Sequence, residues 1–379
     1  MKIAFIGQKG IPMRSGGVEN RVEELSVRLA KKHEVFVYVR NNYTDKNLHE
    51  YKGVKLIHLP SISTKNLDAI SHTFLATMHA LFQNYDIINY QAPGPSTLAW
   101  IIRLFKRKTA VVGTFNSIDC MHKKWGWFAR KYLQFGEYAV SKFPNKTIAV
   151  TPIIKEYMKE KFAAEGTVVL NGAGVEYTEA DNLLAEWGLQ KKKYFIYVGR
   201  LVRHKGVHYL IEAFQKLIVE KKIPADMKLA IVGDSAYTDE YVASLKAMSA
   251  GWDNIIFTGT QFGEKLKQLF SHAYLFVQPS EAEGLSMALL DAMGCGLAPL
   301  VSDIKENLDP TADCGFAFKN MDVIDLADKM QYLVENPQMV EARALLAKKN
   351  MNEKYNWDKS AEETEAVYQE AINSKLNIA

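Results

Sequence analysis

Residues 278–296 read QPSEAEGLSMALLDAMGCG, and the order of elements that they predict decides the expected fold. The stretch overlaps the end of the apolar run Tyr274–Gln278, which is typical of a buried strand. Gly284 then leads into an apolar helical run, whose first N–H groups, at Leu285 to Met287, lack partners within the helix and are open to an anion. A strand, a glycine turn and a helix in this order are typical of a parallel α/β sheet.

Asp291 is the unusual residue of this stretch. It lies five residues after Ser286, about one and a half turns into the predicted helix. A solvent-facing carboxylate would have polar neighbours at helical spacing, but Met287, Leu290 and Cys295 are not polar. We therefore expect Asp291 to be buried. Because a buried carboxylate needs hydrogen-bond partners, the ribose hydroxyls of a bound nucleotide would serve.

Strand-like and helix-like segments alternate outward from this stretch along the whole chain, which is typical of parallel sheets covered by helices on both faces. The first series of predicted strands is Lys2–Ile6, Glu34–Val39, Val54–Leu59, Asp86–Tyr90, Thr109–Phe115 and Lys146–Val150. The second series is Tyr194–Val198, Lys228–Val232, Asn254–Thr258, Tyr274–Gln278 and Leu297–Val301. We expect two Rossmann-like domains, residues 1–172 and 188–356, with two further helices, Pro337–Tyr355 and Trp357–Ile372, at the end of the chain.

Two glycine-containing turns are candidates for phosphate binding. Gly16 and Gly17 precede a predicted helix whose apolar stripe faces the sheet while Glu19 and Glu23 take the other side. Paired glycines before a helix let backbone N–H groups approach a phosphate closely, although they also serve turn geometry alone.

The second turn, Gly199–Gly206, follows a predicted strand and carries Arg200 and Lys205. Cations at the carboxyl end of a strand suit a diphosphate, and the alternative is a solvated basic turn.

The composition indicates a globular protein, because 48% of the 379 residues are hydrophobic and 24% are charged. Three dispersed cysteines predict neither disulfides nor a zinc site, and no apolar run predicts a signal peptide or a membrane span, so we expect a cytoplasmic protein.

The two halves of the chain differ in charge. Residues 1–185 carry 25 Lys and Arg against 16 Asp and Glu, whereas residues 186–379 carry 22 against 27. The basic half predicts an anionic partner, such as a phospholipid surface or a phosphorylated acceptor, unless surface lysines simply vary.

Five motifs in this order resemble glycosyltransferase family 4, and the resemblance covers essentially the whole chain. The motifs are Gly16-Gly17-Val18-Glu19, Asn171-Gly172, Gly199-Arg200 through Lys205-Gly206, Val232-Gly233-Asp234 and the block from Glu283 to Asp291. The resemblance implies an α/β protein of the GT-B fold, with two Rossmann-like domains facing a central cleft. The opening Ile6–Pro12 also resembles a bacterial subgroup that builds cell-surface polysaccharides with rhamnosyl or other hexosyl donors.

The resemblance also implies a role for each motif. Residues 1–172 would form the acceptor side and 188–356 the nucleotide-sugar side, with a final helix, 357–379, crossing back onto the first domain. The implied donor-binding residues are Gly16, Gly17, Gly199, Arg200, Lys205, Gly233, Glu283, Gly284, Leu285, Ser286, Met287 and Asp291. Among them, Glu283 would contact sugar hydroxyls, Asp291 the ribose, Arg200 and Lys205 the diphosphate, and the amides of Leu285 to Met287 its distal phosphate. Such enzymes retain the anomeric configuration and use neither a metal nor another cofactor.

Two positions depart from the family pattern. The family has Glu where this chain has Asp291, which is one methylene shorter and predicts a shifted sugar or a bridging water. Members often have His or Asp after the strand Thr109–Phe115, where this chain has Asn116, which cannot take a proton at neutral pH. Asn116 would then hold a sugar hydroxyl. Asp119 and His122 are alternative proton carriers unless they are ordinary loop or cap residues.

The leaving diphosphate itself can accept the acceptor's proton, in which case its electrostatic stabilisation is the principal catalytic effect. The residues that we expect to act in the chemical step are Asn116, Asp119, Arg200, Lys205 and Glu283.

Cations and aromatic residues alternate from His122 to Lys146, and a second such stretch runs from Trp100 to Lys108. A basic aromatic surface suits an anionic membrane that presents a lipid-linked acceptor, although core packing accounts for some of these aromatics. No nucleic acid is expected as a partner.

Three functions follow for testing. The first is a hexosyltransferase that moves a sugar from a nucleotide diphosphate, most often uridine-linked in this family, to a glycan or lipid-linked glycan. The second is a non-catalytic protein that binds nucleotide sugars, suggested by Asn116 and Asp291. The third, a dinucleotide oxidoreductase, lacks both the Gly-x-Gly-x-x-Gly turn and an acidic residue after the second strand.

Overall fold

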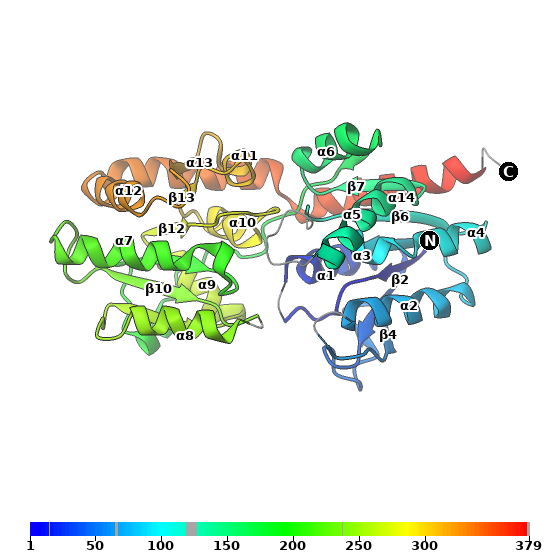
Figure 1. Ribbon diagram of the computed structural model, residues 1–379, viewed down its shortest axis with the longest axis horizontal. Coiled ribbons are helices and arrows are strands. Elements are labelled where there is room, and N and C mark those ends of the chain that lie inside the picture. The colour runs from blue at the N-terminus through cyan, green and yellow to red at the C-terminus, as the bar shows by residue number, and fades with distance from the viewer. Residues whose placement is uncertain (15, 65–66, 119–126, 237, 377–379) are drawn as a thin grey trace. The chain divides into compact units, whose positions relative to one another are not determined.

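The computed structural model describes the chain except for residues 15, 65–66, 119–126, 237 and 377–379. Its contacts divide it into two compact units (Figure 1). Unit 1 contains Met1–Asn171 and the C-terminal segment from Trp357, and unit 2 contains Gly172–Asn356. Each unit is a sheet of parallel strands with helices on its faces, as the alternating pattern predicts.

Unit 1 has a sheet in the order β3-β4-β2-β1-β5-β6-β7-β8, in which all neighbours are parallel except the edge pair β3 and β4. Its strands are β1 (Lys2–Ile6), β2 (Glu34–Arg40), β3 (Glu50–Tyr51), β4 (Val54–Leu59), β5 (Ile87–Gln91), β6 (Ala110–Phe115), β7 (Lys146–Ala149) and β8 (Thr167–Val168). Its helices are α1 (Gly17–Leu29), α2 (Asp68–Leu81), α3 (Pro93–Ser96), α4 (Ala99–Phe105), α5 (Trp127–Lys142), α6 (Pro152–Phe162) and α14 (Trp357–Leu376).

Unit 2 has a parallel sheet in the order β11-β10-β9-β12-β13-β14. Its strands are β9 (Tyr194–Val198), β10 (Lys228–Val232), β11 (Ile255–Gly259), β12 (Leu275–Gln278), β13 (Pro299–Ser302) and β14 (Phe316–Phe318). Its α-helices are α7 (Val207–Val219), α8 (Asp239–Met248), α9 (Gly263–His272), α10 (Met287–Gly294), α11 (Lys305–Thr311), α12 (Val323–Glu335) and α13 (Pro337–Lys354), with short 3₁₀ turns η2 (Asn182–Trp187) and η3 (Arg203–Lys205).

Both sheets reverse their strand order at one point, between β1 and β5 in unit 1 and between β9 and β12 in unit 2. Loops that leave the carboxyl ends of the strands at such a switch point diverge, and ligands of α/β proteins bind in the space between them. The strand order therefore directs attention to the loops after β1 and β5 and after β9 and β12.

Every strand predicted from the sequence is present, with ends that differ by at most two residues. The predictions missed β3, β8 and β14, which are two or three residues long and too short to show a period. The strands have fully buried cores, for example Phe195 and Leu275 in unit 2 and Ile6 and Ile88 in unit 1.

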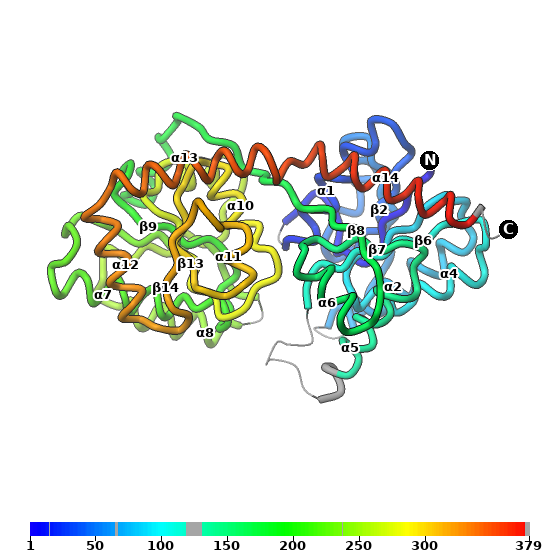
Figure 2. Tube along the Cα trace, turned by 90° about the horizontal axis from the view of Figure 1, so that it is seen from above, coloured from blue at the N-terminus to red at the C-terminus, as the bar shows by residue number. Residues whose placement is uncertain are grey.

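Helix α14, red in Figure 2, belongs to unit 1 although the chain reaches it from unit 2. Tyr368 is buried and its hydroxyl accepts a hydrogen bond from Asn89 Nδ2 in β5 at 2.7 Å. Glu365 lies 2.8 Å from His33 Nε2, and Lys375 donates to the carbonyl of Arg107 at 2.9 Å. These contacts fix the last helix against the first sheet.

Candidate active site

The loops after β9 and β12 pack against each other at the switch point of unit 2. Glu281 N donates to the carbonyl of His204 at 2.8 Å. Gly206 has φ +70°, and a Cβ placed there would lie 1.9 Å from the carbonyl oxygen of Pro279. Because backbone meets backbone at this point, glycine is required. The two loops that carry most of the predicted donor-binding residues are thus brought together.

Lys205 and Glu283 form an ion pair between these loops. Lys205 Nζ lies 2.6 Å from each carboxylate oxygen of Glu283. Their side chains are 16% and 6% exposed. Ser280 Oγ donates a third hydrogen bond to the same carboxylate, at 2.6 Å. Burial, followed by the negative charge of Glu283, raises the pKa of the neighbouring Tyr197 well above its usual value.

Arg200 is exposed at the end of β9, and no ion pair with its guanidinium is present among the described residues. The backbone next to Arg200 is tightly packed. A Cβ at Gly233, where φ is +149°, would lie 1.9 Å from the Gly199 carbonyl oxygen. This contact brings the ends of β9 and β10 together. Arg200 is therefore available to an anion, whereas the charge of Lys205 is partly neutralised.

Helix α10 begins at Met287, two residues later than the sequence predicts, a difference no larger than those at the strand ends. Ser286 is its N-cap, with a side-chain oxygen that accepts from Leu289 N at 3.3 Å. Ser286 Oγ also donates to Gln278 Oε1 at 2.6 Å. Leu285 therefore precedes the helix, and Ser286 secures its first turn to the end of β12.

Asp291 is 9% exposed, as expected from its apolar neighbours. Its Oδ1 accepts hydrogen bonds from Gly174 N at 2.7 Å and Val175 N at 3.3 Å. Backbone amides thus bond Oδ1 in the free protein, and the contact of Asp291 with ribose hydroxyls stays a prediction. Burial, followed by the charge of Asp291, raises the pKa of Cys295 to about 12, so that thiol stays protonated.

The loop between β1 and α1, called the glycine loop here, donates backbone hydrogen bonds to two carboxylates of α1. Glu19 Oε1 accepts from Lys9 N at 3.0 Å, and Glu23 Oε2 accepts from Met13 N at 2.5 Å. Glu19 is only 6% exposed. Glu19 and Glu23, which the sequence places on the side of the helix opposite its apolar stripe, thus bond the loop that precedes the helix. Gly16 is the N-cap of α1, and its φ of +106° requires a residue without a side chain.

Asn116 directly follows β6, as predicted, and it is half-buried. Its Nδ2 is buried and has no hydrogen-bond partner among the described residues. An unsatisfied amide donor at the carboxyl edge of a sheet is costly unless a ligand accepts from it. Asp119 and His122 lie outside the described residues, as does the start of the aromatic, basic stretch from His122.

Sequence reasoning missed Ser280, Gln278 and Asn307. Ser280 orients Glu283, and Gln278 accepts from Ser286 while its Nε2 donates to Asn307 Oδ1 at 2.6 Å. Ser280 could have been found from the sequence, because it is a short polar residue three positions before Glu283. Nothing local points to Asn307, because it follows β13, far along the chain.

No group of three or more His, Cys, Asp or Glu side chains is arranged to hold a metal ion within the part of the chain that the structure describes. Across the same residues, every helix is too short or too polar to cross a bilayer.

Sequence models of two adjoining domains match this chain. Residues 15–177 match the model described as Glycosyltransferase Family 4, and residues 180–352 match Glycosyl transferases group 1. Among curated proteins, an uncharacterized glycosyltransferase of Methanocaldococcus jannaschii is 23% identical over 385 residues, covering 94% of this chain and 96% of the relative.

Two solved structures share the fold along nearly the whole chain. Anabaena HepE in complex with UDP and glucose has a TM-score of 0.80 at 18% identity, covering 97% of this chain and 98% of that one. WaaG, a glycosyltransferase involved in lipopolysaccharide biosynthesis, has a TM-score of 0.73 at 16% identity, covering 96% and 98%. The two matching domain models and this shared architecture lead to one assignment: the chain belongs to glycosyltransferase family 4 and is a transferase with the GT-B fold.

Proposed function

We propose that the protein transfers a hexosyl group, with retention of anomeric configuration and without a metal, from a nucleotide-diphosphate sugar to a hydroxyl of a glycan or lipid-linked glycan. In this reaction the bond between the sugar C1 and the diphosphate oxygen breaks, and the acceptor oxygen bonds to C1 on the same face. The acceptor's proton passes to the leaving diphosphate. No oxidant or further reactant is needed.

The observation that carries this proposal is the cluster of Arg200, Lys205 and Glu283 at the switch point of unit 2. A guanidinium without an ion-pair partner among the described residues and a nearby ammonium suit the two phosphates of the donor. A carboxylate held in place by Ser280 suits two hydroxyls of the sugar. As negative charge develops on the leaving diphosphate, these fixed cations stabilise it more than they stabilise the bound donor.

In this proposal, the ion pair between Lys205 and Glu283 rearranges when the donor binds. In the free protein the ammonium lies between two carboxylate oxygens. A bound diphosphate would accept a hydrogen bond from the Lys205 ammonium, which would then bond the Glu283 carboxylate less fully. Hydroxyls of the sugar would donate to the carboxylate oxygens that the ammonium no longer bonds. Binding of the two halves of the donor is then coupled through one pair of side chains.

We propose a uridine diphosphate sugar as donor and cell-surface polysaccharide synthesis as the setting. HepE, whose structure contains UDP and glucose, and WaaG, which acts in lipopolysaccharide biosynthesis, support both choices through the shared fold. The Gly16 and Gly17 turn would contribute backbone N–H groups to the donor.

Asn116 is proposed to hold a hydroxyl of the donor sugar, because its Nδ2 lacks a partner in the described part of the chain. It supplies no base, so the proton transfer is assigned to the diphosphate. Asn116 also favours a second candidate function, a protein that binds nucleotide sugars without turnover.

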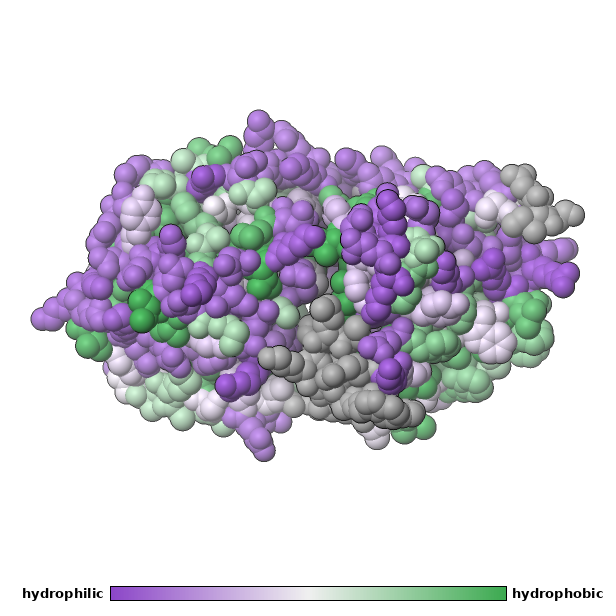
Figure 3. Space-filling model, turned by 45° about the horizontal axis from the view of Figure 1, so that its top comes forward, coloured by the Kyte–Doolittle hydropathy of each residue, from purple (hydrophilic) through white to green (hydrophobic). Residues whose placement is uncertain are grey.

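Unit 1 presents a surface suited to a membrane-bound acceptor, formed by α2 and α4. Large apolar side chains are exposed there, among them Phe74 (49%), Leu104 (56%) and Phe105 (67%), and Figure 3 shows hydrophobic surface in green where unit 1 lies. No Asp or Glu occurs between Asp86 and Asp119, whereas α4 is followed directly by Lys106, Arg107 and Lys108. We propose that this apolar and cationic surface contacts an anionic membrane.

Purified protein incubated with a panel of UDP-sugars and with glycan or lipid-linked acceptors tests the function. We expect release of UDP and a product of retained configuration in the presence of EDTA, with loss of both in Glu283→Ala. UDP-sugar binding without turnover on any acceptor would favour the non-catalytic alternative. Absence of any UDP-dependent rise in melting temperature would refute both.

A further inference from the structure

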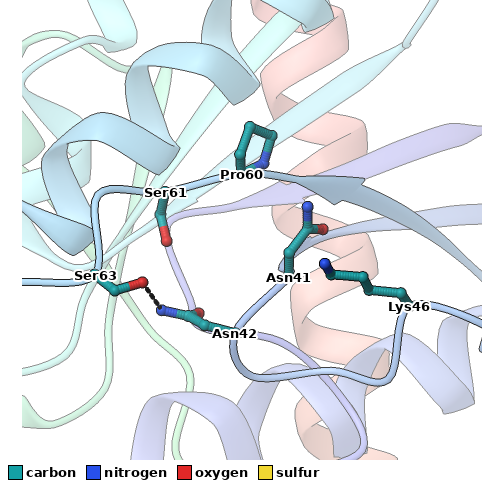
Figure 4. A pocket seen from close by; sticks show the side chains of 6 residues that line it. All are labelled: Asn41, Asn42, Lys46, Pro60, Ser61 and Ser63. Atoms are coloured by element: carbon teal, nitrogen blue, oxygen red, sulfur yellow. Dashed lines mark hydrogen bonds between the residues drawn. The ribbon is translucent and has the colours of Figure 1, made fainter.

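A pocket of about 370 Å³, lined mainly by polar residues, lies in unit 1 (Figure 4). It is lined by Asn41, Asn42 and Lys46 from the loop after β2, and by Pro60, Ser61 and Ser63 from the loop after β4. Strands β2 and β4 are parallel neighbours, with Arg40 paired to Leu59 at their ends. Both loops therefore leave the sheet at its carboxyl edge, where α/β proteins bind ligands.

The loop after β2 is bonded to the glycine loop that follows β1. Arg40 N donates to the carbonyl of Lys9 at 2.8 Å, and Thr44 Oγ1 donates to the carbonyl of Ile11 at 3.1 Å. Glu19 holds the same loop from the other side through Lys9 N. The loop that carries Asn41 and Asn42 is thus hydrogen-bonded to the loop that leads into Gly16 and Gly17.

An ion pair between a buried arginine and a half-buried aspartate orders the lining residues. Arg40 is 5% exposed and its Nη1 lies 2.6 Å from Asp68 Oδ2. Asp68 Oδ1 accepts from Ser61 Oγ at 2.5 Å and from Asn42 Nδ2 at 3.3 Å. Although burial raises the pKa of Asp68, hydrogen bonds from Ser61 and Arg40 hold it below its usual value, so the carboxylate stays ionised. A site ordered before binding loses less conformational freedom when a ligand arrives.

The lining chemistry matches a sugar. Figure 4 shows Asn42 bonded to Ser63, at 3.0 Å, with the side chains of Asn41 and Ser61 on either side of the same space. Amides and hydroxyls each donate and accept, as sugar hydroxyls do, and the Pro60 ring offers an apolar face for C–H groups. Asn41 Oδ1 has no hydrogen-bond partner among the described residues, and rotation of its terminal torsion presents either end of the amide to a ligand.

The charges around the pocket favour an anionic ligand. Lys46 points toward Asn41 in Figure 4, and no ion pair involving its ammonium occurs in the described part of the chain. Two further cations, Lys9 and Arg14, lie over the ring of Tyr43, at 6.0 and 5.8 Å from its centroid. Tyr43 belongs to the same loop as Asn41. The half-buried carboxylate of Asp68, which bonds Ser61 and Asn42, is already paired with Arg40.

We infer that this pocket binds a sugar unit of the acceptor that carries a carboxylate or phosphate, with Lys46 contacting the anionic group and Asn42 and Ser63 contacting hydroxyls. The inference rests on the proposed function, because it assigns an acceptor to that reaction. It names the substrate class as an acidic glycan and gives unit 1 a selective role.

The test compares a tetrasaccharide of galacturonic acid with its carboxyl-reduced, neutral counterpart by ligand-observed NMR titration of the full chain. We expect the acidic form to bind wild type about fivefold more tightly, as one exposed ion pair allows. Lys46→Gln should abolish this preference without changing the neutral ligand's Kd. Asn42→Ala should weaken both ligands. The control, Lys31→Gln, removes an exposed lysine just after the C-terminal end of α1 and should behave as wild type.

Equal binding of the two tetrasaccharides by wild type, or an unchanged preference in Lys46→Gln, would overturn the inference. So would no binding of either ligand. UDP binding, followed as a rise in melting temperature, is measured in parallel on every variant. If UDP binds normally while the sugar results are negative, the acceptor inference fails and the proposed function stands. If UDP fails to bind wild type, the proposed function fails.

Discussion

Lys205 Nζ lies equally close, at 2.6 Å, to both carboxylate oxygens of Glu283, although the two residues are 78 positions apart in the chain. Each was expected to contact a different part of the donor. Their pairing means that the free protein holds the carboxylate proposed to bind sugar hydroxyls and one cation proposed to bind phosphate in a single arrangement.

Lys205→Ala should destabilise the protein, because it leaves Glu283 buried without its cation. We expect the free energy of unfolding in urea to fall by about 3 kcal/mol. The control is Lys265→Ala, which breaks an exposed ion pair with Glu186 and should cost less than about 1 kcal/mol. Equal losses in the two variants would show that the buried pair contributes no more than a surface pair.

Arg200→Ala should impair the reaction without affecting stability, because its guanidinium is exposed and without an ion-pair partner in the described residues. We expect kcat/KM for the donor to fall about 100-fold, with an unchanged melting temperature. Arg203→Ala removes a nearby exposed cation and serves as the control. If both variants lose activity to the same extent, the effect reflects general charge rather than the position of Arg200.

Asp291→Ala should loosen the segment that contains Gly174 and Val175, because their amides lose the carboxylate that accepts from them. Hydrogen bonds to a charged group support a loss of about 2 kcal/mol in the free energy of unfolding. Hydrogen exchange at these two amides should become faster. Unchanged exchange would mean that water replaces the carboxylate without penalty.

Stability should fall as the pH drops from about 6.5 to about 4, because of His72. Burial, followed by the positive charge of Arg40, lowers the pKa of His72 to about 4. An unfolded histidine titrates near 6.5, so in this window the unfolded chain binds a proton that the folded chain does not. His72 should therefore contribute a loss of about 3 kcal/mol across the window. Urea unfolding of His72→Gln should show a weaker pH dependence, whereas the exposed control His49→Gln should match wild type.

Membrane contact should depend on the apolar surface of α2 and α4. We expect wild type to sediment with vesicles that contain anionic lipid, and the double variant Phe74→Ser, Leu104→Ser to remain largely in the supernatant. Leu345→Ser is the control, because Leu345 is 73% exposed but lies on α13 in unit 2. Equal sedimentation of all three proteins, or wild-type binding that is unaffected by the charge of the vesicles, would contradict the proposal.

The sequence by itself determined the architecture and the positions of most of the candidate site. Apolar runs alternating with helical stretches predicted both parallel sheets, and their ends placed Arg200, Lys205, Glu283 and Asn116 beyond the strands that they follow. These features are readable because strand and helix periods, and the glycines that end them, are local properties of the chain.

Only the tertiary structure decided which side chains meet. The pairing of Lys205 with Glu283, the amide partners of Asp291 and the burial of Glu19 against the glycine loop all join residues from different elements. A sequence does not distinguish a carboxylate that faces water from one that bonds a backbone amide or a buried cation. Its partner is fixed by the strand order and by loop packing, such as the approach of Gly206 to Pro279, and no local pattern contains that information.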